Sequence, residues 1–237
     1  MAEQQVHPRR SFGAAEIQAL VSLVIVLALM LGGMFGVAGT WDWPRGWVFF
    51  GAYIVLTLIA CVWLWIVNPE IFAARSKMQA GTKDWDKILT VVIVLAYLVI
   101  YPVSALDDGR FHWAPQPDWV VYLGLAMFTL GFMGFTWASS VNRHFEATVR
   151  IQTDRDHKVI DTGPYAIVRH PGYILALIMV AGMPLAMGSL YGLIPAGVMV
   201  LLILTRTLAE DATLKAELPG YKEYAARVRY RWIPGIF

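Results

Sequence analysis

Charged residues are scarce in this sequence, and long stretches of it have none. Only 15% of its 237 residues are charged and 58% are hydrophobic, whereas an ordinary soluble domain carries about 25% charged residues. A helix needs roughly 20 apolar residues to cross a hydrocarbon layer about 30 Å thick. Uncharged windows of that length cover 17–41, 46–69, 88–106, 119–142 and 170–205. The shortage of charge therefore argues against a soluble domain and predicts an all-α, polytopic membrane protein.

Cysteine is nearly absent too, because Cys61 is the only one. A single cysteine excludes an intramolecular disulfide and a cysteine-based metal cluster. The sequence also lacks a G-x-G-x-x-G fingerprint after an expected strand, which argues against a soluble dinucleotide-binding domain. His7, His112 and His157 lie in expected loops with no partners at metal-ligand spacing, so we expect no metal site and no role for these three side chains.

The last hydrophobic window is too long for one crossing. Pro184 and the glycines of "PLAMGSLYG" interrupt it, which predicts a tight helical hairpin over about 171–207. About six membrane-embedded helices result, and the first four are expected at about 17–40, 46–67, 88–106 and 119–141.

The expected spans suggest two parts of the chain. We expect residues 1–141 to be a membrane scaffold, in which "GGMFG" at 32–36 suits close helix packing. Residues 142–237 would be the catalytic half, with a cytosolic loop, the hairpin and an amphipathic cytosolic helix near the C-terminus.

The basic residues predict the orientation in the membrane. Seventeen of the 19 lysines and arginines, Arg9 and Arg10 among them, lie on one side of the expected spans, and only Arg45 and Arg110 lie on the other. Loops rich in lysine and arginine stay in the cytoplasm, so we expect both termini there. "RRSFG" at 9–13 resembles a twin-arginine signal, but the hydrophobic segment after it, of about 23 residues, is too long to be cleaved. The absence of a terminal retention signal favours a bacterial plasma membrane.

A cluster of polar residues flanks the hairpin. Pro171 suits the first turn of a helix, whose free N–H groups and positive dipole end would lie beside Arg169 and His170 and hold an anionic group. The hairpin returns Arg206 to the same side, and Glu210, four residues on, shares its helix face. Such a carboxylate can hold a cationic amine or sulfonium. The simpler alternative is that both arginines are interfacial anchors and that Glu210 is a solvated charge.

The loop before the hairpin adds further candidates. "TGPY" at 162–165 predicts a turn, in which Gly163 takes a positive φ and Pro164 fixes the next φ. Asn142 and His144 follow the fourth span directly and are candidates to line the same mouth.

Together these motifs resemble a known family. "GPY…RHPGY" (163–173), an apolar hairpin, "RTLAED" (206–211), "LPGYKEYAARV" (218–228) and "RWIP" (231–234) are similar to the isoprenylcysteine carboxyl methyltransferases and the related phospholipid N-methyltransferases. The resemblance covers about the last 100 residues, and the first 120 carry no motif of the family.

The resemblance implies an integral membrane methyltransferase that uses S-adenosylmethionine at the cytosolic face and takes a lipid-like substrate laterally from the bilayer. It assigns cofactor binding to Gly163, Pro164, Tyr165, Arg169, His170, Tyr173 and Glu210, and catalysis to Arg206 and Glu210. The second acid of the family's pair is Asp211 here instead of glutamate, which leaves its role open.

The acceptor stays open at this point. A carboxylate acceptor needs no general base and would be positioned by Arg206, whereas an amine could pass its proton to Glu210. The alternatives are an NADPH-dependent membrane reductase of sterols or polyprenoids and a lipid-binding scaffold without activity. The net charge of +2 gives no reason to expect a nucleic-acid partner, and the oligomeric state is not predicted.

Overall fold

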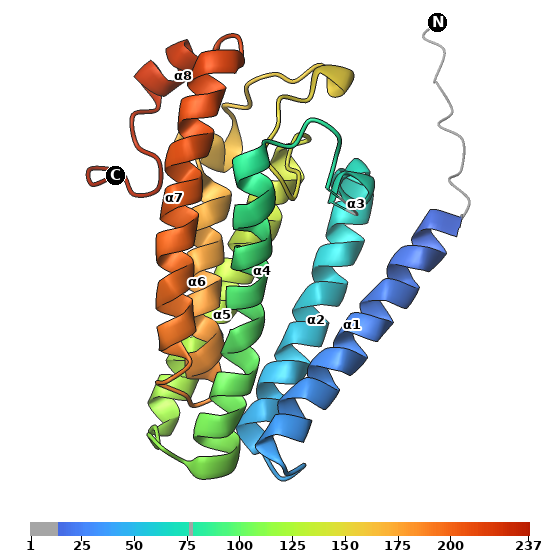
Figure 1. Cartoon of the computed structure of the whole chain (residues 1–237), viewed down its shortest axis with the longest axis vertical. Helices are drawn as coiled ribbons and strands as arrows, with labels where there is room; N and C mark the ends of the chain where they lie inside the picture. Colours follow the sequence, from blue (N-terminus) through green and yellow to red (C-terminus); the bar gives the residue numbers. More distant parts are fainter. Residues whose placement is uncertain (1–13, 76–77) are drawn as a thin grey trace, which may run out of the picture.

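The computed structural model describes residues 14–75 and 78–237, with side chains from residue 21 onward, and shows a bundle of long helices (Figure 1). The helices are α1 (Ala14–Ala38), α2 (Pro44–Val67), α3 (Glu70–Arg75), α4 (Asp84–Ser104), α5 (Asp118–Val141), α6 (Pro171–Ala186), α7 (Leu193–Glu217) and α8 (Tyr221–Arg227). A π-helical segment, Ala105–Phe111, continues α4, and two 3-10 turns, Thr153–Arg155 and Gly163–Ala166, lie between α5 and α6. His7, Arg9, Arg10 and the 9–13 motif lie outside the described residues.

The expected all-α membrane fold is confirmed. Five helices in the described part of the chain are long and apolar enough to span a membrane, namely α1, α2, α4 with its π-helical continuation, α5 and α7. The sixth, α6, is apolar but has only 16 residues, about 24 Å at 1.5 Å per residue. The hairpin is therefore asymmetric, since α7 continues to Glu217, ten residues beyond its expected end. The expected division of the chain after residue 141 stays a prediction.

Helices α5 and α6 are held together by glycines, which let the two backbones approach closely. A Cβ atom placed on Gly124 would lie 2.2 Å from the backbone nitrogen of Ala186, and one on Gly131 would lie 2.4 Å from that of Met179. From the other side, a Cβ on Gly182 would lie 2.4 Å from the nitrogen of Phe128. Because lipid tails are as apolar as the side chains, such close van der Waals packing is what holds membrane helices together.

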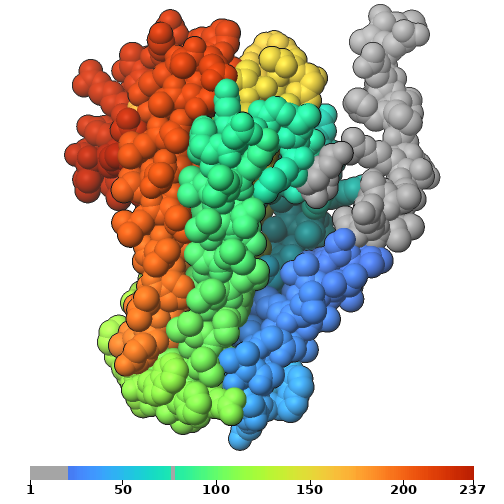
Figure 2. Space-filling view, viewed as in Figure 1, coloured from blue at the N-terminus to red at the C-terminus, as the bar shows by residue number. Residues whose placement is uncertain are grey.

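The expected packing role of "GGMFG" is wrong. No heavy atom lies within 4 Å of a Cβ placed on Gly32, Gly33 or Gly36, and all three residues are exposed. They lie on the outer surface of α1, which diverges from the rest of the bundle in Figure 1. In contrast, α4 and α7 run side by side along one face (Figure 2).

Two buried carboxylates fix the end of the bundle opposite α8. Asp108 accepts hydrogen bonds from Trp43 Nε1 and Arg45 Nη1, both at 2.8 Å. Asp107, which is fully buried, accepts from Ser189 Oγ at 2.7 Å and from the backbone nitrogen of Ala114 at 3.0 Å. These contacts join the connections between α1 and α2, α4 and α5, and α6 and α7. The other end of the bundle carries α3, α8 and the long connection between α5 and α6 (Figure 1).

A bulky side chain at the contact between α5 and α6 is expected to destabilise the protein. Gly131→Leu would press against backbone atoms of α6 that cannot move aside, at a cost of at least about 1–3 kcal/mol. We expect a clearly lower melting temperature of the detergent-purified protein, measured by circular dichroism. Gly32→Leu is the matched control, because it faces open space and should leave the melting temperature unchanged. Equal melting temperatures for both variants would contradict the packing described here.

Candidate functional site

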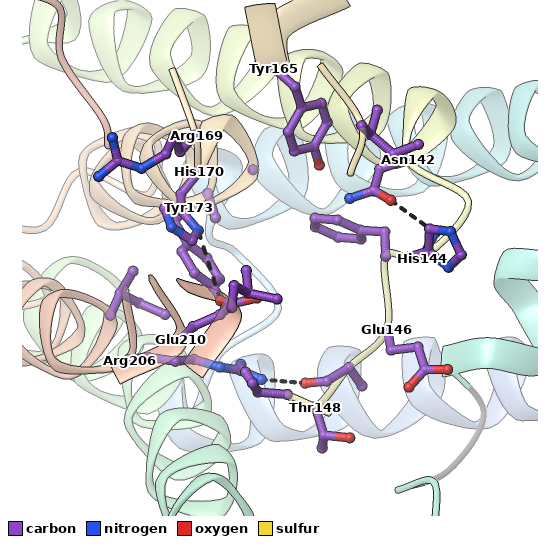
Figure 3. A pocket seen from close by; sticks show the side chains of 18 of the residues that line it. Asn142, His144, Glu146, Thr148, Tyr165, Arg169, His170, Tyr173, Arg206 and Glu210 are labelled. Atoms are coloured by element: carbon purple, nitrogen blue, oxygen red, sulfur yellow. Dashed lines mark hydrogen bonds and ion pairs between the residues drawn. The ribbon is translucent and has the colours of Figure 1, made fainter. Parts of the chain in front are cut away.

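A cavity of about 320 Å³ lies where α4, α6 and α7 meet the connection between α5 and α6. Its polar wall is at the α8 end of the bundle, and Figure 3 shows His170, Tyr173 and Glu210 on one side of it and Asn142 and His144 on the other. The cavity brings together Tyr165, Arg169, His170, Tyr173, Arg206 and Glu210, which are six of the eight site residues expected from the sequence. Gly163 and Pro164 do not line it.

The first turn of α6 orients the carboxylate of Glu210. Pro171 begins the helix, so His170 lies just before its first turn and Tyr173 lies within it. Their rings stack, with centroids 5.7 Å apart. The Tyr173 hydroxyl donates a hydrogen bond of 2.5 Å to Glu210 Oε2, and His170 Nδ1 lies 3.9 Å from the same oxygen. Glu210 Oε1 has no partner among the described residues. The Glu210 side chain keeps 22% exposure, so this second oxygen is available to a ligand.

From the sequence we expected Arg169 to hold an anion at the start of α6. In the structure its guanidinium makes four hydrogen bonds within the protein. Nε and Nη2 donate to the Asp211 carboxylate at 2.8 and 3.2 Å, and Nη1 donates to the carbonyls of Val228 and Arg229, both at 2.7 Å. The backbone nitrogen of His170 is also paired, with the carbonyl of Arg231 at 2.9 Å. Arg169 therefore fastens the C-terminal segment to the site.

Asp211, whose role the sequence left open, is the centre of this cluster. Besides Arg169, its carboxylate accepts hydrogen bonds from Lys215 Nζ at 2.8 Å, Arg231 Nε at 3.1 Å and the Tyr221 hydroxyl at 3.1 Å. The side chain is 2% exposed, so Asp211 holds the protein together where its neighbour Glu210 faces the cavity.

Arg206 is bound to a carboxylate that sequence reasoning missed. Its Nη2 donates to Asp86 Oδ2 at 3.0 Å and to the carbonyl of Ala147 at 2.8 Å, and Asp86 also accepts from the backbone nitrogen of Val149 at 2.6 Å. The guanidinium lies 5.8 Å from the centre of the Tyr173 ring. Asp86 lies on the first turn of α4, in a half of the sequence without a recognisable motif, so only the fold shows its role.

The loop between α5 and α6 contributes two neutral histidines. His144 lines the cavity as expected, and the backbone nitrogen of His144 donates a hydrogen bond of 2.8 Å to Asn142 Oδ1. His157, which we expected to be without a role, lines the cavity too, and its ring centroid lies 4.5 Å from that of His144. Burial is the main reason that the pKa of His157 is lowered to about 4, and the positive charges of Arg150 and Arg155 contribute. Burial likewise lowers the pKa of His144.

The turn at Gly163–Ala166 contributes one residue, Tyr165, to the cavity wall. Gly163 has the expected positive φ, of 57°, and Pro164 is buried in the turn. Tyr165 is the member that reaches the cavity, and its carbonyl accepts a hydrogen bond of 2.7 Å from the Tyr224 hydroxyl. Burial raises the pKa of Tyr165, so its hydroxyl stays protonated at neutral pH.

Below the charged residues the cavity wall is apolar. It is made of Ile93, Val94, Tyr97, Ala176, Met179, Val180, Met199 and Ile203, from α4, α6 and α7. Met199 lies seven residues before Arg206 on α7, which is about 10 Å along the helix at 1.5 Å per residue. The cavity thus has a polar mouth, and an apolar floor between α4, α6 and α7. No group of three metal-ligating side chains occurs in the described part of the chain.

Acidification is expected to destabilise the loop that carries the two histidines. The unfolded chain takes up a proton on His157 below about pH 6.5, whereas the folded protein resists this until about pH 4. Stability should therefore fall as the pH drops through this window. We expect His157→Asn, whose side-chain oxygen can still accept the hydrogen bond from Gln152 N, to reduce the loss of melting temperature between about pH 7 and pH 5. An unchanged pH dependence would contradict this, and His112→Asn at the opposite end is the control.

Two comparisons with known proteins indicate the class of this protein. The phospholipid methyltransferase family matches residues 119–217, from α5 to the end of α7. Protein-S-isoprenylcysteine O-methyltransferase B of Arabidopsis thaliana is 26% identical over 144 residues, which cover 60% of this chain and 68% of the plant protein. Both matches are methyltransferases, and neither supports the reductase considered as an alternative. These two matches indicate that the chain is a membrane methyltransferase, similar to the phospholipid methyltransferases and to the isoprenylcysteine carboxyl methyltransferases.

Proposed function

We propose that this protein transfers a methyl group from S-adenosylmethionine to a lipophilic acceptor at the cytosolic face of the membrane. The observation that supports it best is the carboxylate of Glu210, which Tyr173 holds at the mouth of a cavity with an apolar floor. The methyl donor carries a carboxylate, an ammonium and a sulfonium, so its site needs donors, an acceptor and apolar surface together.

The residues present fit this cofactor. Glu210 offers a free oxygen to the ammonium or the sulfonium, and the stacked rings of His170 and Tyr173 keep that carboxylate in place. Tyr165 adds an aromatic wall. We therefore assign cofactor binding to His170, Tyr173, Glu210 and Tyr165, whereas Gly163, Pro164 and Arg169 support the site from behind. When bound, S-adenosylmethionine supplies a methyl group on a positively charged sulfur, which is a good leaving group.

The apolar floor suits the tail of the acceptor. A phospholipid and a prenylated cysteine, which the names of the matched family and of the plant relative specify, both combine a polar head with a long apolar tail. The tail would lie between α4, α6 and α7 while the head reaches the polar mouth, so the protein's main contribution is to orient the two reactants and exclude water.

The two expected catalytic residues take different parts. Arg206 is anchored by Asp86 and by the carbonyl of Ala147, so it presents a fixed positive charge to the head of the acceptor. Glu210 faces the cavity from the next turn of α7, where it can hold the cofactor or accept a proton from an amine.

The orientation follows from the basic residues. The polar mouth opens at the end of the bundle that carries α3, α8 and the loop between α5 and α6. Together with the residues around the start of α4, the second half of α7 and the residues after α8, these segments hold most of the lysines and arginines, and such segments face the cytoplasm. We therefore place the mouth of the cavity and the C-terminus in the cytoplasm, where soluble S-adenosylmethionine has access.

Glu210 is expected to be essential for cofactor binding. Glu210→Gln removes a charge-assisted contact, and we expect the affinity for S-adenosylhomocysteine, measured by calorimetry on the detergent-purified protein, to fall about 10-fold to 100-fold. Glu217→Gln is the matched control, because Glu217 lies on the same helix but pairs with Lys83 at 2.7 Å outside the cavity. Undiminished binding by Glu210→Gln would refute the assigned site. Binding of NADPH alone would favour the reductase over the methyltransferase.

A further inference from the structure

Arg75, the last residue of α3, reaches the cavity from the half of the chain that carries no family motif. Its guanidinium carbon lies 5.2 Å from the centre of the Phe145 ring and 5.5 Å from that of Phe135. Arg75 is an exposed residue, and its side chain lines the cavity. Desolvation of the guanidinium, together with the charge of Arg206, lowers the pKa of Arg75 to about 10.

Arg75 differs from the other basic residues of the cavity in having no carboxylate partner. Each of the others is paired within the protein: Arg150 with Glu146, Lys158 with Asp156, Arg169 with Asp211 and Arg206 with Asp86. Around Arg75, by contrast, no described carboxylate lies within ion-pair distance, and the charge of a second guanidinium, that of Arg206, acts on it. Two like charges in a space of low dielectric repel each other, so the cavity is complementary to one additional anion.

The position of Arg75 is set before any ligand binds. Phe145 lies against the first turn of α6, where a Cβ on Gly172 would come within 2.8 Å of its ring. Phe135 packs edge-on against Phe145, with ring centroids 5.4 Å apart. A guanidinium held on two fixed aromatic rings loses little freedom when it binds a carboxylate with two parallel hydrogen bonds.

We propose that Arg75 binds the carboxylate of the methyl acceptor and so selects an acid over an amine as substrate. This inference rests on the proposed function. The cofactor is common to the family, and the segment that matches the family begins only at residue 119. A residue of α3 lies outside that segment, where the recognition of a particular acceptor is expected to reside.

The chemistry is balanced without a general base. A carboxylate oxygen forms the new bond to the methyl carbon, while the bond from that carbon to sulfur breaks and its electron pair stays on sulfur. The products are a neutral ester and a neutral thioether, and no proton moves. Because the ester has lost its charge, Arg75 no longer binds it strongly, which favours release of the product over the substrate.

The test compares two probes that differ only in this charge, N-acetyl-S-farnesylcysteine and its carboxamide, by calorimetry on the full chain with and without S-adenosylhomocysteine. The wild type is expected to bind the carboxylate at least about tenfold more tightly than the carboxamide. Arg75→Gln should remove this preference while the carboxamide binds as before, which also shows that the variant is folded. Arg75→Lys should keep part of the preference, and the affinity for S-adenosylhomocysteine should stay unchanged in both variants.

Arg143→Gln is the control, since this exposed arginine of the loop between α5 and α6 bonds only a backbone carbonyl. Equal binding of the two probes by the wild type, or an undiminished preference in Arg75→Gln, would overturn the proposal. A loss of S-adenosylhomocysteine affinity in Arg75→Gln would assign the residue to the cofactor's carboxylate instead and overturn it as well. If the wild type shows the preference but binds no S-adenosylhomocysteine, the proposed function fails while the carboxylate site stands.

Discussion

The ion pair between Arg169 and Asp211 holds together the parts of the chain that form the site. It joins the segment before α6 to the last third of α7, and the same two side chains bind the carbonyls of Val228 and Arg229 and the side chain of Arg231. Both members are almost fully buried, where an ion pair is stable only if further hydrogen bonds satisfy it. Here they do, so the next residue on the helix, Glu210, is fixed facing the cavity.

In a bilayer the hydrophobic effect does not drive helices together, so other contacts must. At the end opposite α8, Asp107 and Asp108 accept hydrogen bonds from donors of three connections. Along the middle, Gly124 and Gly131 bring α5 against α6. At the α8 end, Asp86 joins α4 to α7 and to the loop before α6. The site occupies the space that these contacts leave open, with charge at its mouth and hydrocarbon below.

Charge within this cavity is nearly balanced by internal pairs, and the two exceptions carry the functional meaning. Glu210 has an oxygen to offer to a cation, and Arg75 lacks a carboxylate among the described residues. A ligand pair in which one member bears a positive sulfur and the other a carboxylate would satisfy both at once. Protein-S-isoprenylcysteine O-methyltransferase B, to which the chain is similar, is named for methylation at oxygen, which agrees with this reading of the charges.

The sequence by itself determined the membrane class, the helices and the local motif around the hairpin, because hydrophobic length and the order of nearby residues are properties of the chain alone. It also predicted Tyr165, His170, Tyr173, Arg206 and Glu210 as site residues, since they lie in that motif. Only the tertiary structure decided which of the paired acids faces the cavity, that Asp86 anchors Arg206 and that Arg75 lines the cavity. Their roles depend on distances to residues far along the chain, and a sequence pattern records neither a distance nor a missing partner.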